Sequence, residues 1–203
     1  MAFIDFSKRE IQCKIVYYGP GRGGKTTNLL YIHKAMTENV RGKMVSIDTK
    51  GDRTLFFDFL PLSLGSIHNM SIKIQLYTVP GQVMYNASRK LVLKGVDGVV
   101  FVADSLRVRR ANNLESLANL EENLKGENLD MTRIPLVLQY NKRDLADGEI
   151  PLMTIEELDE DLNSQLHVPS FPGSAIKGTG VFETLREISK ITVKQVHEKL
   201  LKR

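Results

Sequence analysis

The sequence predicts a single α/β domain, in which helices cover both faces of a mostly parallel sheet with one antiparallel edge strand. Segments with strand character alternate with segments of helical periodicity along the 203 residues, which is typical of parallel sheets with crossover helices. Residues 96–104 are almost entirely apolar, as expected for a strand that is buried on both faces. A glycine-rich turn also follows the first predicted strand, at the edge where such sheets bind ligands.

Each element is predicted from its apolar periodicity and from the turn residues at its ends. β-branched and aromatic residues predict the first strand, and leucines three or four residues apart predict the helix that Gly126 ends. Two apolar segments separated by a short polar turn predict a hairpin. The predicted strands are 11–18, 56–67, 71–79, 96–104 and 134–141, and the predicted helices are 26–36, 113–125, 155–166 and 181–201. We expect all of them to form one domain, 1–203.

The composition excludes collagen-like, low-complexity and wholly disordered proteins. Hydrophobic residues make up 42% and charged residues 26% of the chain, as in an ordinary soluble protein. The net charge of +4 is spread along the chain, so no nucleic-acid partner is expected. Cys13 is the single cysteine and no apolar run approaches the ~20 residues that span a bilayer. We therefore expect a monomeric cytoplasmic protein without a stable membrane anchor.

The first chemical motif lies between the first strand and the first helix. Residues 19–26 match G-x-x-x-x-G-K-[ST], in which glycines let backbone N–H groups surround a phosphate at a helix N-terminus. Lys25 is expected to reach the β- and γ-phosphates, and the Thr26 hydroxyl to bind Mg²⁺. The predicted phosphate-binding residues are Gly19, Gly21, Arg22, Gly23, Gly24, Lys25, Thr26 and Thr27.

The second motif, N-K-R-D, follows a predicted buried strand. The Asp144 carboxylate can accept two N–H groups from guanine, whereas adenine would leave it unpaired at a free-energy cost. We expect the Lys142 stem to lie along the base and the Asn141 amide to connect this loop to the phosphate loop. A later loop, Ser174-Ala175-Ile176, is expected to offer the Ala175 N–H to the guanine O6. Together the motifs predict GTP or GDP as the ligand.

The order of these motifs, with Pro80-Gly81-Gln82 between them, resembles the Ras-like small GTPases over nearly the whole chain. Four long segments resemble the bacterial MglA subfamily more closely: CKIVYYGPGRGGKTTNL, DRTLFFDFLPLSLG, LYTVPGQVMYNASRKLVLKGVDGVVFVADS and QYNKRDL. The resemblance implies the three-layer P-loop NTPase fold of small G proteins.

The same resemblance implies a function as a molecular switch in cell polarity and gliding motility. It implies slow GTP hydrolysis, GTP-dependent effector binding on the switch face, and recruitment to a cell pole by partners. It also implies a GTPase-activating partner, an MglB-like homodimer of roadblock domains.

Several site residues follow from the resemblance. Thr49 and Thr54 are both candidates for the threonine that binds Mg²⁺ and senses the γ-phosphate, and the match through DRTLFFDF selects Thr54. Gln82 is expected to orient the attacking water after Gly81, as a glutamine does in Ras. Arg53 is expected to act as an arginine finger supplied by the chain itself. Gln82, Arg53 and Lys25 are thus the predicted catalytic residues.

One departure from the family pattern leaves a second interpretation open. Most Ras-like proteins carry Asp-x-x-Gly before the catalytic glutamine, whereas here the stretch begins with Thr78. The missing carboxylate would normally hold a Mg²⁺-bound water. A nucleotide-gated scaffold that binds GTP with little hydrolysis is therefore the main alternative. A P-loop ATPase or kinase is disfavoured by Asp144.

A group of arginines follows the predicted strand at 96–104. Arg107, Arg109 and Arg110 lie close to Asp104 in the sequence. A solvated loop is the simpler interpretation of these three side chains, and a partner-binding patch is the alternative.

Overall fold

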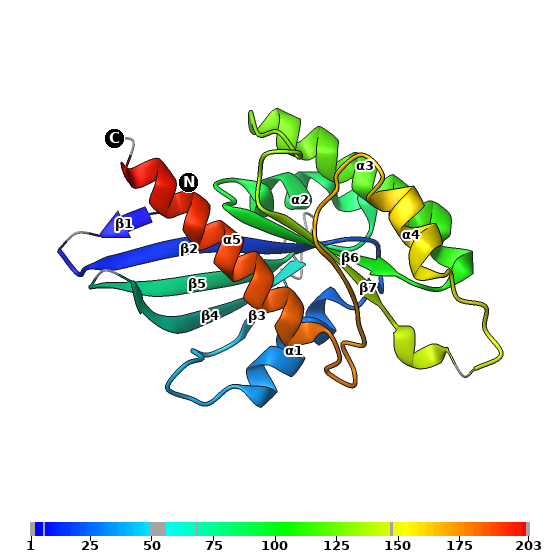
Figure 1. Cartoon of the computed structure of the whole chain (residues 1–203), viewed down its shortest axis with the longest axis horizontal. Helices are drawn as coiled ribbons and strands as arrows, with labels where there is room; N and C mark the ends of the chain where they lie inside the picture. The colour runs from blue at the N-terminus through cyan, green and yellow to red at the C-terminus, as the bar shows by residue number, and fades with distance from the viewer. Residues whose placement is uncertain (1–2, 6, 49–55, 68, 147, 202–203) are drawn as a thin grey trace.

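The structure is a computed structural model that describes residues 3–5, 7–48, 56–67, 69–146 and 148–201. An eight-stranded sheet runs through the molecule in the order β3-β4-β5-β2-β6-β7-β8, and β1 pairs with β2 (Figure 1). The strands are β1 (Phe3–Asp5), β2 (Glu10–Tyr18), β3 (Val45–Asp48), β4 (Phe56–Ile67), β5 (Met70–Thr78), β6 (Gly98–Asp104), β7 (Leu136–Asn141) and β8 (Ser170–Pro172). The helices are α1 (Lys25–Ala35), α2 (Asn86–Leu93), α3 (Arg110–Gly126), α4 (Ile155–Leu162) and α5 (Val181–Leu201), with short 3-10 helices η1 (Val83–Tyr85), η2 (Arg107–Arg109) and η3 (Arg143–Leu145).

The sheet confirms the predicted fold class. Strands β5, β2, β6, β7 and β8 are parallel, and β4 runs antiparallel to β5 as the predicted hairpin requires. The antiparallel strand is not the edge strand, because β3 pairs outside it, and β1 is a second antiparallel strand. Strands β1, β3 and β8 were not predicted, since three or four residues are too few to display an alternating pattern.

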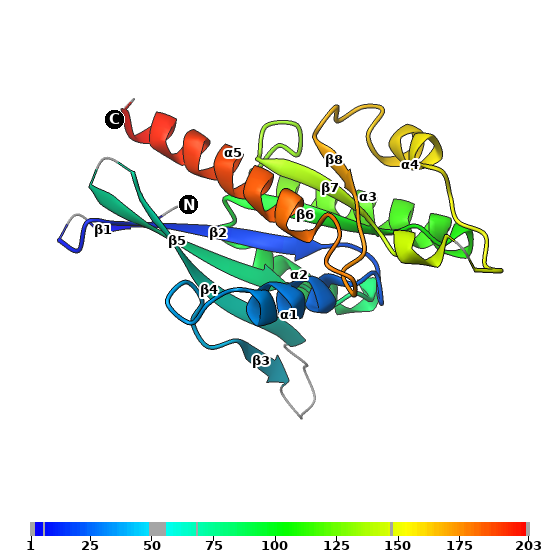
Figure 2. The same ribbon diagram turned by 60° about the horizontal axis from the view of Figure 1, so that its bottom comes forward.

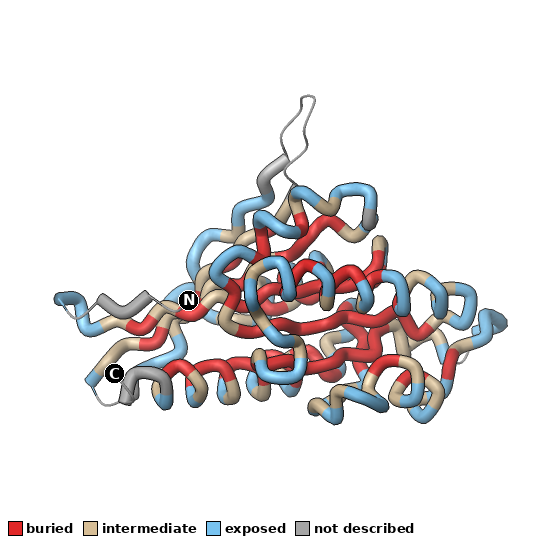
Figure 3. The backbone as a smooth tube through the Cα atoms, turned by 90° about the horizontal axis from the view of Figure 1, so that it is seen from above, coloured by how far each residue is buried: buried red, intermediate tan, exposed pale blue. Residues whose placement is uncertain are grey.

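Helices cover both faces of the sheet in three layers (Figure 2). Helices α1 and α5 pack on one face, where Leu29, Ile32 and Ile188 are fully buried against strand residues. Helices α2, α3 and α4 pack on the other face through residues such as Leu93 and Leu120. Figure 3 shows the buried residues concentrated along the central strands. Within the described residues, no helix is long and apolar enough to cross a membrane.

The strand order determines where functional side chains can meet. Four neighbouring parallel strands, β5, β2, β6 and β7, end at Thr78, Tyr18, Asp104 and Asn141. The carboxyl ends of parallel strands share one edge of a sheet, and ligands of open α/β sheets bind there. The glycine-rich loop, the Pro80-Gly81-Gln82 segment and the N-K-R-D loop therefore all begin at this edge.

Candidate functional site

The glycine-rich loop connects β2 to α1 and is packed tightly against the N-K-R-D loop. Gly24 has a φ of +101°, and a Cβ at this position would lie 2.0 Å from Asn141 Nδ2. Only glycine avoids both the strain and the collision. Gly23 N–H donates to Pro20 O at 3.2 Å and Arg22 has a φ of +61°. The loop therefore curls at the start of α1, where unpaired helical N–H groups favour an anion.

The Lys25 ammonium is buried inside this loop with only 6% of the residue exposed. Its Nζ donates to Gly19 O at 3.0 Å and to Pro20 O at 2.8 Å. Burial, and then the positive charge of Arg89, lower the pKa of Lys25 to about 7, against the opposing attraction of Asp58. A phosphate would add negative charge beside this ammonium and raise its pKa.

Arg89 of α2 is a second buried cation at the same edge. It is fully buried and donates to the carbonyls of Pro80 and Gly81 at 2.9 and 2.7 Å. It also donates to Asn119 Oδ1 at 2.7 Å and to the Tyr18 hydroxyl at 3.3 Å. All of these acceptors are uncharged, so Arg89 adds net positive charge to the site while it holds the segment after β5 in place. Sequence reasoning missed Arg89, which belongs to no recognisable motif.

Asp58 of β4 supplies one of the buried carboxylates at this edge. It is 2% exposed, and its Oδ2 accepts from Thr26 Oγ1 at 2.6 Å and from Thr78 Oγ1 at 2.9 Å. Its Oδ1 accepts from Ser46 Oγ at 2.7 Å. A negative charge thus lies beside Thr78, the residue that replaces the usual aspartate. Sequence reasoning missed Asp58, although a lone acidic residue among apolar ones in 56–62 was a signal.

The segment after β5 lies directly on the glycine-rich loop. A Cβ at Gly81 would be 2.3 Å from Gly21 Cα, so only glycine allows this approach. Gln82 follows as an exposed residue. A pocket of about 440 Å³ opens between the two segments and the start of α3, and its lining includes Gly21, Arg22, Gln82 and Arg109. Gln82 and the loop therefore face a common space.

Asn141 joins the second predicted loop to the first. Its Nδ2 donates to Gly23 O at 2.8 Å, and its Oδ1 accepts from the Ala175 N–H at 2.8 Å. This is the expected connection between the N-K-R-D loop and the phosphate loop. Lys142 Nζ donates to the buried Asp104 Oδ2 at 2.6 Å, which fixes the direction of the lysine stem.

The Ala175 N–H donates to Asn141 Oδ1 and so fastens the later loop to the site. Its expected contact with the guanine O6 stays a prediction. Ser174 is buried and its Oγ accepts from the Lys177 N–H at 3.1 Å, so it shapes the loop. Ile176 is 76% exposed. Asp144 lies half-buried in η3, at the entrance to this region.

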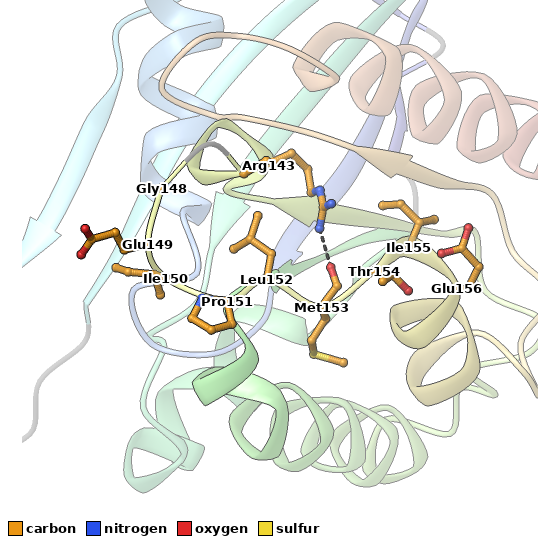
Figure 4. A pocket seen from close by; sticks show the side chains of 11 residues that line it. Arg143, Gly148, Glu149, Ile150, Pro151, Leu152, Met153, Thr154, Ile155 and Glu156 are labelled. Atoms are coloured by element: carbon orange, nitrogen blue, oxygen red, sulfur yellow. Dashed lines mark hydrogen bonds between the residues drawn. The ribbon is translucent and has the colours of Figure 1, made fainter.

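A further pocket lies beside the N-K-R-D loop but is separate from the residues that would read a base. Figure 4 shows it between η3 and the start of α4, with Arg143 directed at the Met153 carbonyl. That hydrogen bond from Arg143 Nη1 is 2.6 Å long. The lining runs from Arg143 through residues 148–156 and contains neither Lys142 nor Asp144.

Three predicted residues lie outside the described part of the chain. Arg53, Thr54 and the alternative Thr49 fall in residues 49–55. Thr26 Oγ1, the other predicted metal ligand, is bound to Asp58, and Thr27 follows it half-buried in the first turn of α1.

Known proteins are similar to this chain over most of its length. Residues 2–192 match the ADP-ribosylation factor (Arf) family. The chain is 53% identical over 196 residues to the mutual gliding-motility protein MglA of Myxococcus xanthus, covering 97% of this chain and 98% of the relative. It is 25% identical to the Ras-related protein RABG3f of Arabidopsis thaliana, over 96% of this chain and 89% of that protein. It is 27% identical to Ras-related protein Rab-28 of Caenorhabditis elegans, over 86% and 64%.

The matched residues include the whole sheet and every loop described above, among them the glycine-rich loop and the N-K-R-D loop. The chain therefore belongs to the Arf and Ras-like family of guanine-nucleotide-binding GTPases, within the bacterial MglA subfamily.

Proposed function

We propose that this protein is a GTP-hydrolysing molecular switch that controls gliding motility and cell polarity. The observation that supports this proposal best is that Asn141 joins the glycine-rich loop, beside which Lys25 and Arg89 are buried, to the N-K-R-D loop. One ligand that has both phosphates and a guanine fits this arrangement, because phosphates balance Lys25 and Arg89 while Asp144 pairs with guanine N–H groups. The similarity to a gliding-motility protein supports the cellular role.

We also propose that Mg²⁺ binds with the nucleotide, beside Thr26. Hard divalent cations prefer oxygen ligands and often act through bound waters. Thr26 Oγ1, Thr78 Oγ1 and the Asp58 carboxylate form such an oxygen group, and Thr54 is the further expected ligand. In this arrangement Asp58 supplies the charge that an aspartate at position 78 would otherwise give. When bound, Mg²⁺ would neutralise charge on the phosphates.

For hydrolysis we propose that Gln82 orients the attacking water and that Lys25 stabilises negative charge on the phosphates. Arg53 would complete the site as a finger from the chain itself. A GTPase-activating homodimer of roadblock domains would then need only to order the segment that carries Arg53. Its docking surface, shared with effectors and recruitment partners at a cell pole, would include Met84 and Tyr85, which are 79% and 38% exposed. The protein alone is proposed to be a cytoplasmic monomer.

Asp144→Asn is expected to change the base specificity. The new amide no longer accepts both guanine N–H groups, but it can donate to the extra carbonyl of xanthine. Affinity for GDP should fall at least about tenfold, the cost of an unpaired buried donor, while affinity for xanthosine diphosphate should rise. Competition against a fluorescent nucleotide measures both, with the neighbouring Arg143→Gln as the control. Unchanged GDP affinity would show that this loop does not read the base.

Asp58→Asn is expected to weaken Mg²⁺ binding. Removal of a carboxylate that supports a metal site typically raises the required metal concentration ten- to a hundredfold. The measurement is GDP release as a function of Mg²⁺, since bound Mg²⁺ slows release, and release in EDTA should match the wild type. Adding Thr78→Asp should restore Mg²⁺ dependence, whereas Ser46→Ala, which keeps the carboxylate, should change it little. An unaltered Mg²⁺ titration in Asp58→Asn would refute this role.

The lowered pKa of Lys25 predicts that the protein takes up a proton when it binds a nucleotide. With a pKa of about 7, the free side chain is mostly neutral at pH 8, and phosphates raise its pKa on binding. Uptake should therefore approach one proton at pH 8, and affinity should fall as pH rises above 7, by up to about tenfold per unit. Calorimetry in buffers of different ionisation enthalpy counts the protons. Lys25→Arg, which stays charged, should take up none, and an equal absence in the wild type would contradict the assignment.

Single-turnover GTP hydrolysis tests the proposed activity. A Cβ at Gly21 would lie 3.6 Å from Gln82 Cγ, so the methyls of Gly21→Val should displace Gln82 and stop turnover while GDP still binds. Arg53→Ala should lower turnover at saturating roadblock partner by at least about a hundredfold, with little effect on nucleotide affinity. If the wild type binds GTP yet fails to hydrolyse it with the partner, the scaffold alternative is correct.

A further inference from the structure

The three arginines at the start of α3 make different contacts. Arg107 binds both carboxylate oxygens of Glu157 at 2.8 and 2.7 Å, and Arg110 binds those of Asp161 at 2.8 and 2.7 Å. These two pairs fasten η2 and the first residue of α3 to α4. Arg109 contacts the glycine-rich loop instead, where its Nη2 donates to Gly21 O at 2.8 Å. Only Arg109 of the three is therefore connected to the nucleotide site.

The contact with Gly21 O fixes one peptide group of the phosphate loop. The C=O of Gly21 and the N–H of Arg22 belong to the same planar trans peptide and point in opposite directions. A donor on the carbonyl side therefore holds the Arg22 N–H on the other side. Such N–H groups are the phosphate ligands of a glycine-rich loop. The left-handed φ of +61° at Arg22 is uncommon for a residue other than glycine, so contacts that hold this peptide favour the observed conformation.

Arg109 is itself held by a buried carboxylate. Its Nε lies 3.7 Å from Asp104 Oδ2, and Asp104 is fully buried. The same oxygen binds Lys142 of the N-K-R-D loop at 2.6 Å. Asp104 thus anchors both the lysine on the base side and the arginine on the phosphate side. Asp104 partly balances the charge of Arg109 and holds its side chain in place. The guanidinium can therefore position the loop through its hydrogen bond to Gly21 O.

The position of Gly21 indicates which phosphate is affected. Gly21 lies against Gly81, and the pocket beside it is lined by Gln82 and Arg109. Since Gln82 is proposed to face the attacking water, this end of the loop is the end at which the third phosphate would lie.

We propose that Arg109 is a positioning residue that holds the Gly21–Arg22 peptide in the orientation that receives the terminal phosphate, and so favours GTP over GDP. This inference rests on the proposed function and deepens it. Loss of one charged hydrogen bond that acts on the loop should weaken binding of the triphosphate about three- to tenfold. Binding of the diphosphate should change less than about twofold, because in this proposal its phosphates would lie further from Gly21.

The experiment measures the affinities of GDP and of a non-hydrolysable GTP analogue for the full chain with saturating Mg²⁺. Arg109→Gln should lower the preference for the triphosphate about three- to tenfold, and Arg109→Lys should restore part of it. Arg107→Gln and Arg110→Gln are matched controls, because they break the α3–α4 pairs and should leave the preference unchanged. Thermal unfolding of all four variants reports their folding.

The outcomes separate the two proposals. If the wild type binds neither nucleotide, the proposed function fails. If it binds both and Arg109→Gln keeps the wild-type preference, or weakens both nucleotides equally, the role of Arg109 is overturned. A change of preference in Arg107→Gln or Arg110→Gln as large as that in Arg109→Gln would also overturn it, since the effect would then come from general loosening of α3.

Discussion

The architecture of the site depends on two basic side chains that are buried before any ligand arrives. Lys25 and Arg89 are both enclosed at the carboxyl edge of the sheet, and their hydrogen-bond acceptors are uncharged carbonyl, amide and hydroxyl oxygens. Burying a cation without a counter-charge is unfavourable, and burial lowers the pKa of Lys25 accordingly. Backbone oxygens from two loops surround both side chains and offset part of this cost. An anion bound at this edge would offset more of the cost than the attraction of Asp58 does alone.

The remaining parts of the site hold those two loops in register with each other. Asn141 bonds to the phosphate loop with one atom and to the Ala175 loop with another. Arg89 holds the carbonyls of Pro80 and Gly81. Because these contacts are buried, loss of either partner would leave unpaired polar groups in the interior. The phosphate loop, the segment that carries Gln82 and the base loop are therefore connected by buried hydrogen bonds on the sheet edge.

The sequence alone predicted the strands and helices with strong periodicity, and with them the edge at which the site lies. Motif residues such as Lys25 and Asn141 could be found because spacing and residue type define their chemistry. Arg89 could not, since nothing in residues 86–93 distinguishes a buried arginine from a solvated one. Asp58 could not be placed beside Thr78, because only the pairing of β4 with β5 brings the two residues together, and the sequence does not specify that register. The pairing of Ala175 with Asn141 likewise depends on tertiary contacts that no local pattern encodes.

The neighbouring positions of Asp58 and Thr78 constrain how this site can change over generations. The two residues are hydrogen-bonded across adjacent strands, so a carboxylate at either position would occupy nearly the same space. A lineage that exchanges one arrangement for the other must pass through a sequence with two carboxylates or with none. Two buried carboxylates repel each other. A sequence with no carboxylate at either position leaves the neighbouring hydroxyls without their acceptor. Substitutions at positions 58 and 78 should consequently be inherited as a pair.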